Sequence, residues 1–169
     1  MVTTPEKANE PTFVRFAPND IYAGLARNNA DVAANEAKGI VNVRNILYKP
    51  TGTVFLDTFI ANLHQYGYQL HGFHAQRLGV DERELSATLH VLTGMYYREF
   101  VESYFLPIIE DLYNIYPKHM KWISETLGFR SYSGFYRYGV RHGKKKWFRY
   151  GFNYEYEQRM KKKPVEPSL

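Results

Sequence analysis

The sequence predicts an all-α fold with two helix-turn-helix units, a long linker helix between them and a short N-terminal extension. Two observations predict it. Apolar residues recur at helical spacing in several successive stretches. Between these stretches stand glycines that can end one helix, followed by residues able to cap the next. The expected parts are an N-terminal arm at 1–50, a helical domain at 51–160 and a basic tail at 161–169.

The composition is that of a globular chain with one domain or two very small ones. Of its 169 residues, 44% are hydrophobic, and the aromatic residues include 15 Tyr, 11 Phe and 2 Trp. The absence of cysteine excludes disulfides and thiolate metal sites. The N-terminus has no apolar signal-peptide core, and no apolar run approaches the roughly 18 residues of a membrane span. We therefore expect a cytoplasmic protein without membrane contact.

Positive charge is concentrated in the C-terminal third. Residues 118–169 contain 13 Lys or Arg and only 4 Asp or Glu, whereas the residues before them are net acidic. A local basic surface favours a polyanionic partner, because phosphate contacts and counterion release dominate such affinity. A solubilising tail is the alternative explanation for the lysines at 161–163.

The first fifty residues are expected to form an arm. Prolines at 5, 11 and 18 predict poor order in residues 1–20. A cap at Asn19-Asp20 and an alanine-rich composition predict a helix at 21–38, ended by Gly39. Residues 40–48 have the pattern of a strand or an extended segment.

The first helix-turn-helix unit is expected at 72–94, after a helix at 53–66 that Gly67 ends. Its turn lies at Gly79-Val80. Asp81, with Glu84 three residues later, has the spacing of a capping box for a helix at 82–93. This second helix of the unit should bury Leu85 and the apolar residues that follow at helical spacing.

A linker helix is predicted at 96–114, and Pro107 inside it should kink or break it. The second unit follows at 118–142. Gly128 supplies its turn, Ser131 or Ser133 caps its second helix, and Phe135 points into the core. A last, aromatic-rich helix is expected at 147–160.

These units together resemble the DNA-binding domain of the AraC/XylS family of transcription regulators over roughly residues 53–150. The residues that carry the resemblance, in chain order, are Leu78-Gly79-Val80-Asp81, Leu85-Ser86, Thr93-Gly94-Met95, Arg98-Glu99-Phe100, Ile123-Ser124, Leu127-Gly128-Phe129, Ser131, Ser133, Phe135 and Arg137. The resemblance implies a bacterial regulator whose two recognition helices enter successive major grooves of double-stranded DNA, about 34 Å apart. Some fifty preceding residues are too few for the family's ligand-sensing barrel, so no small-molecule effector domain is expected.

The predicted DNA-binding residues follow from this resemblance and from the charge. In the second unit the base-reading face corresponds to Tyr132, Ser133, Tyr136 and Arg137, with Arg130 beside it on the outer surface. The basic residues expected to hold phosphates are Arg141, Lys144, Lys145, Lys146 and Arg149. In the first unit Arg83 and Ser86 occupy reading positions. The alternative for the two tyrosines is packing on the core.

A second function stays open, because the sequence departs from the family pattern. Ala87, Thr88 and His90 stand where the family usually offers Arg or Lys, and the first unit is flanked by acidic residues. A structural or protein-interaction module on a larger nucleoprotein or virion assembly could reuse this fold. Its protein partner would bind through residues 1–50 or the first helix-turn-helix unit.

Neither a metal site nor an enzyme is expected. The spacing of His64, His71 and His74 includes no carboxylate that completes a familiar ligand set, and His74 falls where a core or boundary residue is expected. The sequence has no Ser/His/Asp arrangement, phosphate-binding glycine loop or paired-carboxylate motif. We therefore predict no cofactor and no catalytic residue.

Overall fold

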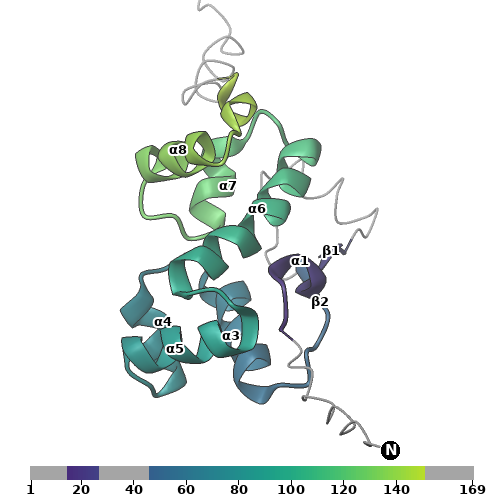
Figure 1. The fold of residues 1–169 in the computed structure, drawn as a ribbon. Helices are drawn as coiled ribbons and strands as arrows, with labels where there is room; N and C mark the ends of the chain where they lie inside the picture. The colour runs from purple at the N-terminus through teal and green to yellow at the C-terminus, as the bar shows by residue number, and fades with distance from the viewer. Residues whose placement is uncertain (1–14, 27–45, 151–169) are drawn as a thin grey trace, which may run out of the picture.

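The computed structural model describes residues 15–26 and 46–150 (Figure 1). Most of these residues are helical, which confirms the predicted all-α class. None of the helices described is long and apolar enough to cross a membrane. The elements in chain order are α1 (Pro18–Ile21), β1 (Tyr22–Leu25), β2 (Ile46–Tyr48), α3 (Val54–Tyr66), α4 (His71–Leu78), α5 (Glu82–Thr93), α6 (Tyr97–Ile115), α7 (Met120–Thr126), α8 (Tyr132–Arg141) and the 3-10 helix η2 (Lys145–Phe148).

The N-terminal region differs from the prediction where it is described. The helix expected at 21–38 is wrong for residues 22–25, which form β1 and pair antiparallel with β2. Gly24 has a φ of 96°, which a helix does not allow, and the Tyr22 hydroxyl donates to Asp111 of α6 at 2.6 Å. Pairing and packing therefore override a weak helical propensity. Residues 26–38 of that helix lie largely outside the described part, as do residues 1–14 and 40–45.

The short helix α1 also corrects the expectation of a poorly ordered arm for residues 15–20. It begins at Pro18, a residue with a fixed φ that suits the first helical turn. Ile21 is 1% exposed in the core, and α1 and β1 both pack on α6. The end of the predicted extended segment is confirmed as β2.

The first helix pair, defined here as α4 and α5, follows α3. The capping box at Asp81 is confirmed, because its side chain accepts from the Arg83 and Glu84 amides and Glu84 accepts from the Asp81 amide. Glycines in left-handed conformations end α4 at Gly79 and α5 at Gly94. The predicted bounds of α5 therefore agree with the structure.

The long helix α6 forms the centre of the fold and lies between the two helix pairs in Figure 1. Pro107 does not break it, since the helix is continuous from Tyr97 to Ile115. The buried residues on α6 include Phe100, Phe105 and Ile108, each at most 1% exposed. Because so many neighbours pack against this helix, tertiary contacts compensate for the hydrogen bond that proline cannot donate.

The second helix pair, defined as α7 and α8, is followed by η2. Gly128, with a φ of 79°, provides its turn, and Ser131 caps α8 by accepting from the Gly134 amide at 3.0 Å. Phe135 is fully buried, as predicted. The described start of the helix expected at 147–160 is instead η2, and Trp147 within it is fully buried.

A short loop at residues 67–70 connects α3 to α4 and contacts the second helix pair, and we call it the bridging loop. Its Tyr68 amide donates to the Leu127 carbonyl at 2.6 Å, and the Tyr68 ring stacks on Phe129 with a centroid distance of 4.4 Å. At Gly67 an added Cβ would lie 2.3 Å from the Leu127 oxygen. Only glycine permits this approach, so the bridging loop meets the turn of the second helix pair backbone to backbone.

Candidate nucleic-acid interface

The outer surface of α8 carries polar and cationic side chains. Ser133, Tyr136 and Arg137 are exposed on this helix, whereas Phe135 and Tyr138 on its other face are at most 1% exposed. The hydroxyl cap at the start of α8 fixes where the helix begins and hence which residues face outward. The structure thus places three of the predicted reading residues together on one accessible surface.

Arg130 and Arg137 lie in the same cleft. The cleft has a volume of about 730 Å³, and the bridging loop forms part of its lining. Both arginines are exposed, and neither makes an ion pair with any residue in the described ranges. Two guanidinium groups without an internal carboxylate can bind phosphate or guanine, both of which match their donor geometry.

Three other residues that were predicted to contact phosphate instead form ion pairs with carboxylates of α6. Arg141 donates to Glu102 at 2.6 Å, and Lys144 lies 3.3 Å from Glu110, which Lys146 also contacts. These residues hold α8 and η2 against α6. Their positive charge is compensated within the protein, so less of it is available to an anionic partner than the sequence predicted.

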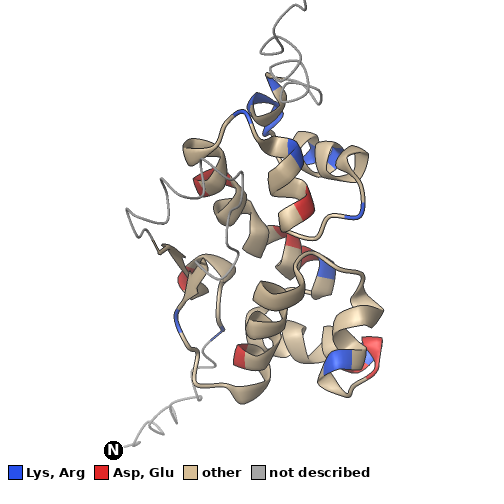
Figure 2. Cartoon of the chain, turned by 180° about the vertical axis from the view of Figure 1, so that it is seen from behind, with Lys and Arg blue, Asp and Glu red and all other residues tan. Residues whose placement is uncertain are grey.

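The remaining predicted basic residues are exposed. Lys145 projects from η2, and the Arg149 guanidinium lies 4.7 Å from the ring centre of Tyr150. Figure 2 shows that Lys and Arg gather on α8 and η2, whereas the first helix pair carries basic and acidic residues together. The basic residues that are concentrated in the C-terminal third of the sequence are therefore also concentrated on one part of the structure.

The two tyrosines of the predicted reading face contact the core as well as solvent. Tyr132 is half-buried and meets the Phe148 ring edge-on at 6.0 Å. Tyr136 remains 45% exposed, although its ring lies 4.7 Å from that of Phe148. Both tyrosines thus take part in packing, and Tyr136 keeps the larger surface available to a ligand.

Glu102 is the most heavily paired carboxylate of the described chain. Burial alone raises its pKa, but hydrogen bonds from Arg98, His142 and Arg141 more than offset this and hold the pKa below its ordinary value. Glu110 behaves in the same way: burial raises its pKa, but hydrogen bonds from Lys146, Trp147 and Lys144 outweigh this and hold the pKa below its ordinary value. Both groups are therefore ionised at neutral pH.

The first helix pair offers a weaker interface. Arg83 is exposed at the start of α5, but Asp81, Glu82 and Glu84 are exposed beside it. The Ser86 hydroxyl accepts a hydrogen bond from the Tyr97 amide at 3.3 Å, so it is tied to α6. Of the two predicted reading residues in this pair, only Arg83 has a free side chain in the described structure.

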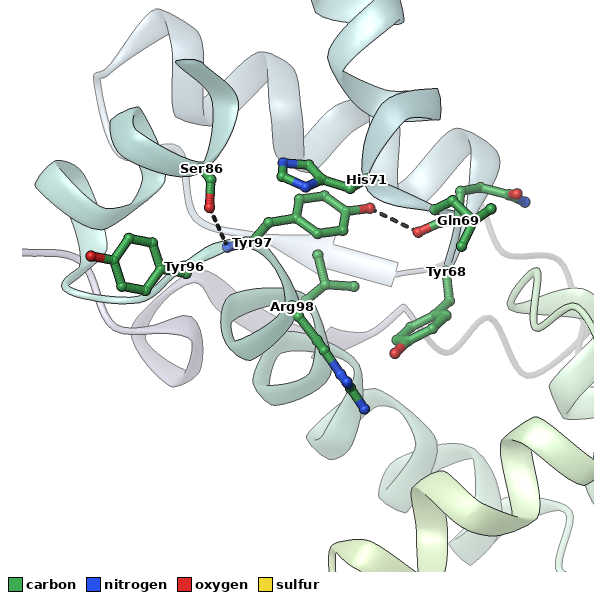
Figure 3. A pocket seen from close by; sticks show the side chains of 9 residues that line it. Tyr68, Gln69, His71, Ser86, Tyr96, Tyr97 and Arg98 are labelled. Atoms are coloured by element: carbon green, nitrogen blue, oxygen red, sulfur yellow. Dashed lines mark hydrogen bonds between the residues drawn. The ribbon is translucent and has the colours of Figure 1, made fainter. Parts of the chain in front are cut away.

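A second groove, of about 500 Å³, lies between the bridging loop, α5 and the start of α6 (Figure 3). His71 stacks on Tyr97 at its edge with a centroid distance of 4.3 Å, and the Tyr97 hydroxyl donates to the Gln69 carbonyl at 2.8 Å. Arg98 reaches out from α6 on one side, as Figure 3 shows. The groove is lined mainly by ring and aliphatic surface.

His64 and His74 are held by hydrogen bonds within the fold. His74 is fully buried and bonds the Gly67 carbonyl at 3.1 Å. His64 bonds the Tyr104 hydroxyl at 2.6 Å, and burial lowers its pKa to about 4. Within residues 15–26 and 46–150, no group of three or more His, Asp or Glu is placed to hold a metal ion.

Several important residues had not been singled out from the sequence. Glu102 and Glu110 were not recognised, although Glu102 stands four residues after Arg98, a spacing that pairs charges on a helix. The contact of the bridging loop with the second helix pair is long-range, and the sequence gives no local signal for it.

Comparison with protein-family models, curated proteins and solved structures finds no match to this chain.

Proposed function

We propose that this chain is a DNA-binding transcription regulator of the AraC/XylS type, acting in the bacterial cytoplasm. In this proposal α5 and α8 enter successive major grooves on one face of a duplex. The support comes from the order of the elements, in which two helix pairs flank one long helix, and from the residues that resemble the family. The partner is double-stranded DNA.

The observation that carries the proposal is the pair Arg130 and Arg137. Both are exposed in one cleft beside α8, and neither has an ion-pair partner among the described residues. Arg141, Lys144 and Lys146 nearby are paired with Glu102 or Glu110. Arg130 and Arg137, left open together in one cleft, form a surface suited to an anionic partner, and the exposed Lys145 lies on η2, which follows the same helix pair.

The two helix pairs would contribute unequally. The second pair supplies Arg130, Ser133 and Arg137 to bases or phosphates, and Lys145 extends this surface. The first pair brings Arg83 next to exposed carboxylates, which repel phosphate. Most of the affinity would thus come from the second pair, with the first pair adding orientation and limited base contact.

Control would come from the abundance of the protein or from a partner that binds residues 1–50 or the first helix pair. The affinity of the protein for DNA is therefore the main property to measure.

The test is a titration of fluorescent duplex DNA at several salt concentrations. The wild-type chain should bind, with affinity that falls as salt rises. Arg137→Ala should weaken binding by about 1–3 kcal/mol, the cost of losing a base-reading arginine. Lys49→Ala removes the same charge from an exposed residue that lines neither groove, and it should leave binding nearly unchanged. Absence of duplex binding by the wild type at low salt would eliminate the proposal.

A second candidate is a structural or interaction module on a nucleoprotein or virion assembly. It is favoured by the exposed acidic start of α5 together with Val91 and Tyr96 near its end, which are 52% and 58% exposed. Aromatic residues are enriched at protein interfaces. A stoichiometric partner that stays bound after nuclease treatment would favour this function over the first.

A further inference from the structure

The bridging loop forms a ridge between the cleft of Arg130 and Arg137 and the groove beside Tyr97. Its residues Tyr68, Gln69 and Leu70 line both of them. One groove continues to α5 and the start of α6 (Figure 3), and the other continues to the beginning of α8. The ridge therefore lies between the two helices that we propose to enter DNA.

Hydrogen bonds and stacking hold this ridge from both sides. The Tyr68 amide and ring contact Leu127 and Phe129 of the second helix pair. The Gln69 side chain donates to the Tyr66 carbonyl at 2.9 Å, and the Gln69 carbonyl accepts from Tyr97. A loop fixed in this way cannot fold back when a partner approaches.

Leu70 differs from its neighbours in the loop. Its carbonyl accepts from the Phe73 amide at 3.0 Å, which fixes its backbone at the start of α4. Its side chain, however, is 71% exposed. A single exposed leucine is ordinary in itself. What distinguishes Leu70 is its place on a rigid ridge, with a groove on each side.

The charges around the ridge suit the edges of a nucleic-acid groove. Arg98 lines the groove on one side, and Arg130 and Arg137 line the groove on the other. Arg98 shares Glu102 with Arg141, so two guanidinium groups face one carboxylate and one positive charge is left uncompensated among these three groups. An apolar tip thus stands between cations on both sides.

Resting on the proposed DNA-binding function, we propose that Leu70 is an apolar wedge that enters the minor groove between the two major grooves occupied by α5 and α8. When two helices occupy successive major grooves on one face, the intervening minor groove faces the protein between them. Arg98 and Arg130 then lie toward the phosphates that border this groove. Leucine is among the side chains that proteins insert between base steps from the minor groove.

The wedge adds a form of sequence selection that α5 and α8 do not supply. Partial unstacking kinks the duplex, and the energetic cost depends on the base step that is opened. Pyrimidine–purine steps open most easily. The central step of the binding site should therefore be flexible, even where no side chain reads its bases.

The experiment uses the full chain and a duplex selected for binding from a random pool. The adenine analogue 2-aminopurine, placed at the central step, fluoresces more strongly when its neighbours unstack. Energy transfer between dyes at the duplex ends reports the bend. The variants are Leu70→Ala and Leu70→Asn, the second of which keeps nearly the size but not the apolar character. Val54→Ala is the matched control, because Val54 is 82% exposed and lines neither groove.

The wild type and Val54→Ala should raise the fluorescence and bend the duplex by an angle within the range of about 20–90° that wedges produce. Both Leu70 variants should lose the fluorescence rise and most of the bend, with affinity reduced about tenfold. A wild type that binds a straight, stacked duplex, or a Leu70→Ala variant that still bends it, would overturn the wedge and leave the DNA-binding function standing. If the wild type binds no duplex at all, the function proposed above fails and the wedge fails with it.

Discussion

Replacing Glu102 by glutamine removes the carboxylate that fastens the second helix pair to α6. Glu102 accepts hydrogen bonds from Arg98 at 2.9 Å, Arg141 at 2.6 Å and His142 at 3.1 Å, and its side chain is only 10% exposed. Glutamine keeps the shape and one acceptor oxygen but loses the charge. The change therefore tests the electrostatic contribution of this cluster with little effect on packing.

The size of the effect follows from the exposure of the partners. A hydrogen bond to a charged group contributes about 1.5–3 kcal/mol. Arg98 and Arg141 are 73% and 44% exposed, so water can replace part of what they lose. We therefore expect the free energy of unfolding to fall by about 2 kcal/mol in total, and the melting temperature to fall by about 4–8 °C.

The pH dependence of the free energy of unfolding tests the role of Glu102 in a second way. The pKa of folded Glu102 lies below its ordinary value of 4.5, so its ionised form stabilises the fold above that pH. This stabilisation is lost as the pH falls through the folded pKa. The difference between wild type and Glu102→Gln should accordingly be full at pH 7 and shrink below about pH 4.5.

Thermal unfolding followed by circular dichroism at several pH values provides the measurement. Glu99→Gln is the control, since Glu99 is exposed on the same helix and makes no ion pair with a described residue. If Glu102→Gln melts at the temperature of the wild type and of this control at pH 7, the ion pairs of Glu102 do not stabilise the fold.

Two further predictions concern other parts of the fold. Gly67→Ala should lower the free energy of unfolding by about 2–5 kcal/mol, because its Cβ would meet the Leu127 oxygen. Gly79→Ala is the control, because Gly79 has a similar φ but nothing near its added Cβ, and its free energy of unfolding should fall by only about 1–2 kcal/mol. Equal losses for the two variants in urea unfolding would contradict the close contact between Gly67 and Leu127. The imidazole of His64 should titrate near pH 4 by NMR, and the stability that its neutral form provides should be complete above about pH 6.5 and decline as the pH falls toward 4. A titration near 6.5 would show that His64 is not desolvated beside Tyr104.

Much of the fold could be predicted because its signals are local. The helix bounds of α5 follow from a capping box at Asp81 and a glycine stop at Gly94, both of which act within a few residues. The burial of Phe135 follows from helical spacing. The strand at 22–25 could not be predicted in this way, because its partner lies more than twenty residues further along the chain.

The sequence could predict which basic residues lie on the second helix pair, but not which of them form ion pairs with carboxylates. The sequence correctly placed Arg130 and Arg137 on the outer surface of the second helix pair. It could not show that Arg141, Lys144 and Lys146 would meet carboxylates of α6, since these partners lie 34 to 39 residues away. A count of basic residues therefore overstates the free positive charge.

Selection of bound sequences from a random duplex pool tests most directly whether this chain reads DNA. If α8 and α5 both read DNA, we expect enrichment of a motif with one strongly selected block, which α8 contacts. A weaker block should follow about one helical turn away, and a flexible base step should lie between them. Arg137→Ala should degrade the strong block first. Recovery of a pool no different from the starting one, under salt conditions where the protein still binds duplex, would contradict sequence reading and leave only general attraction to phosphate.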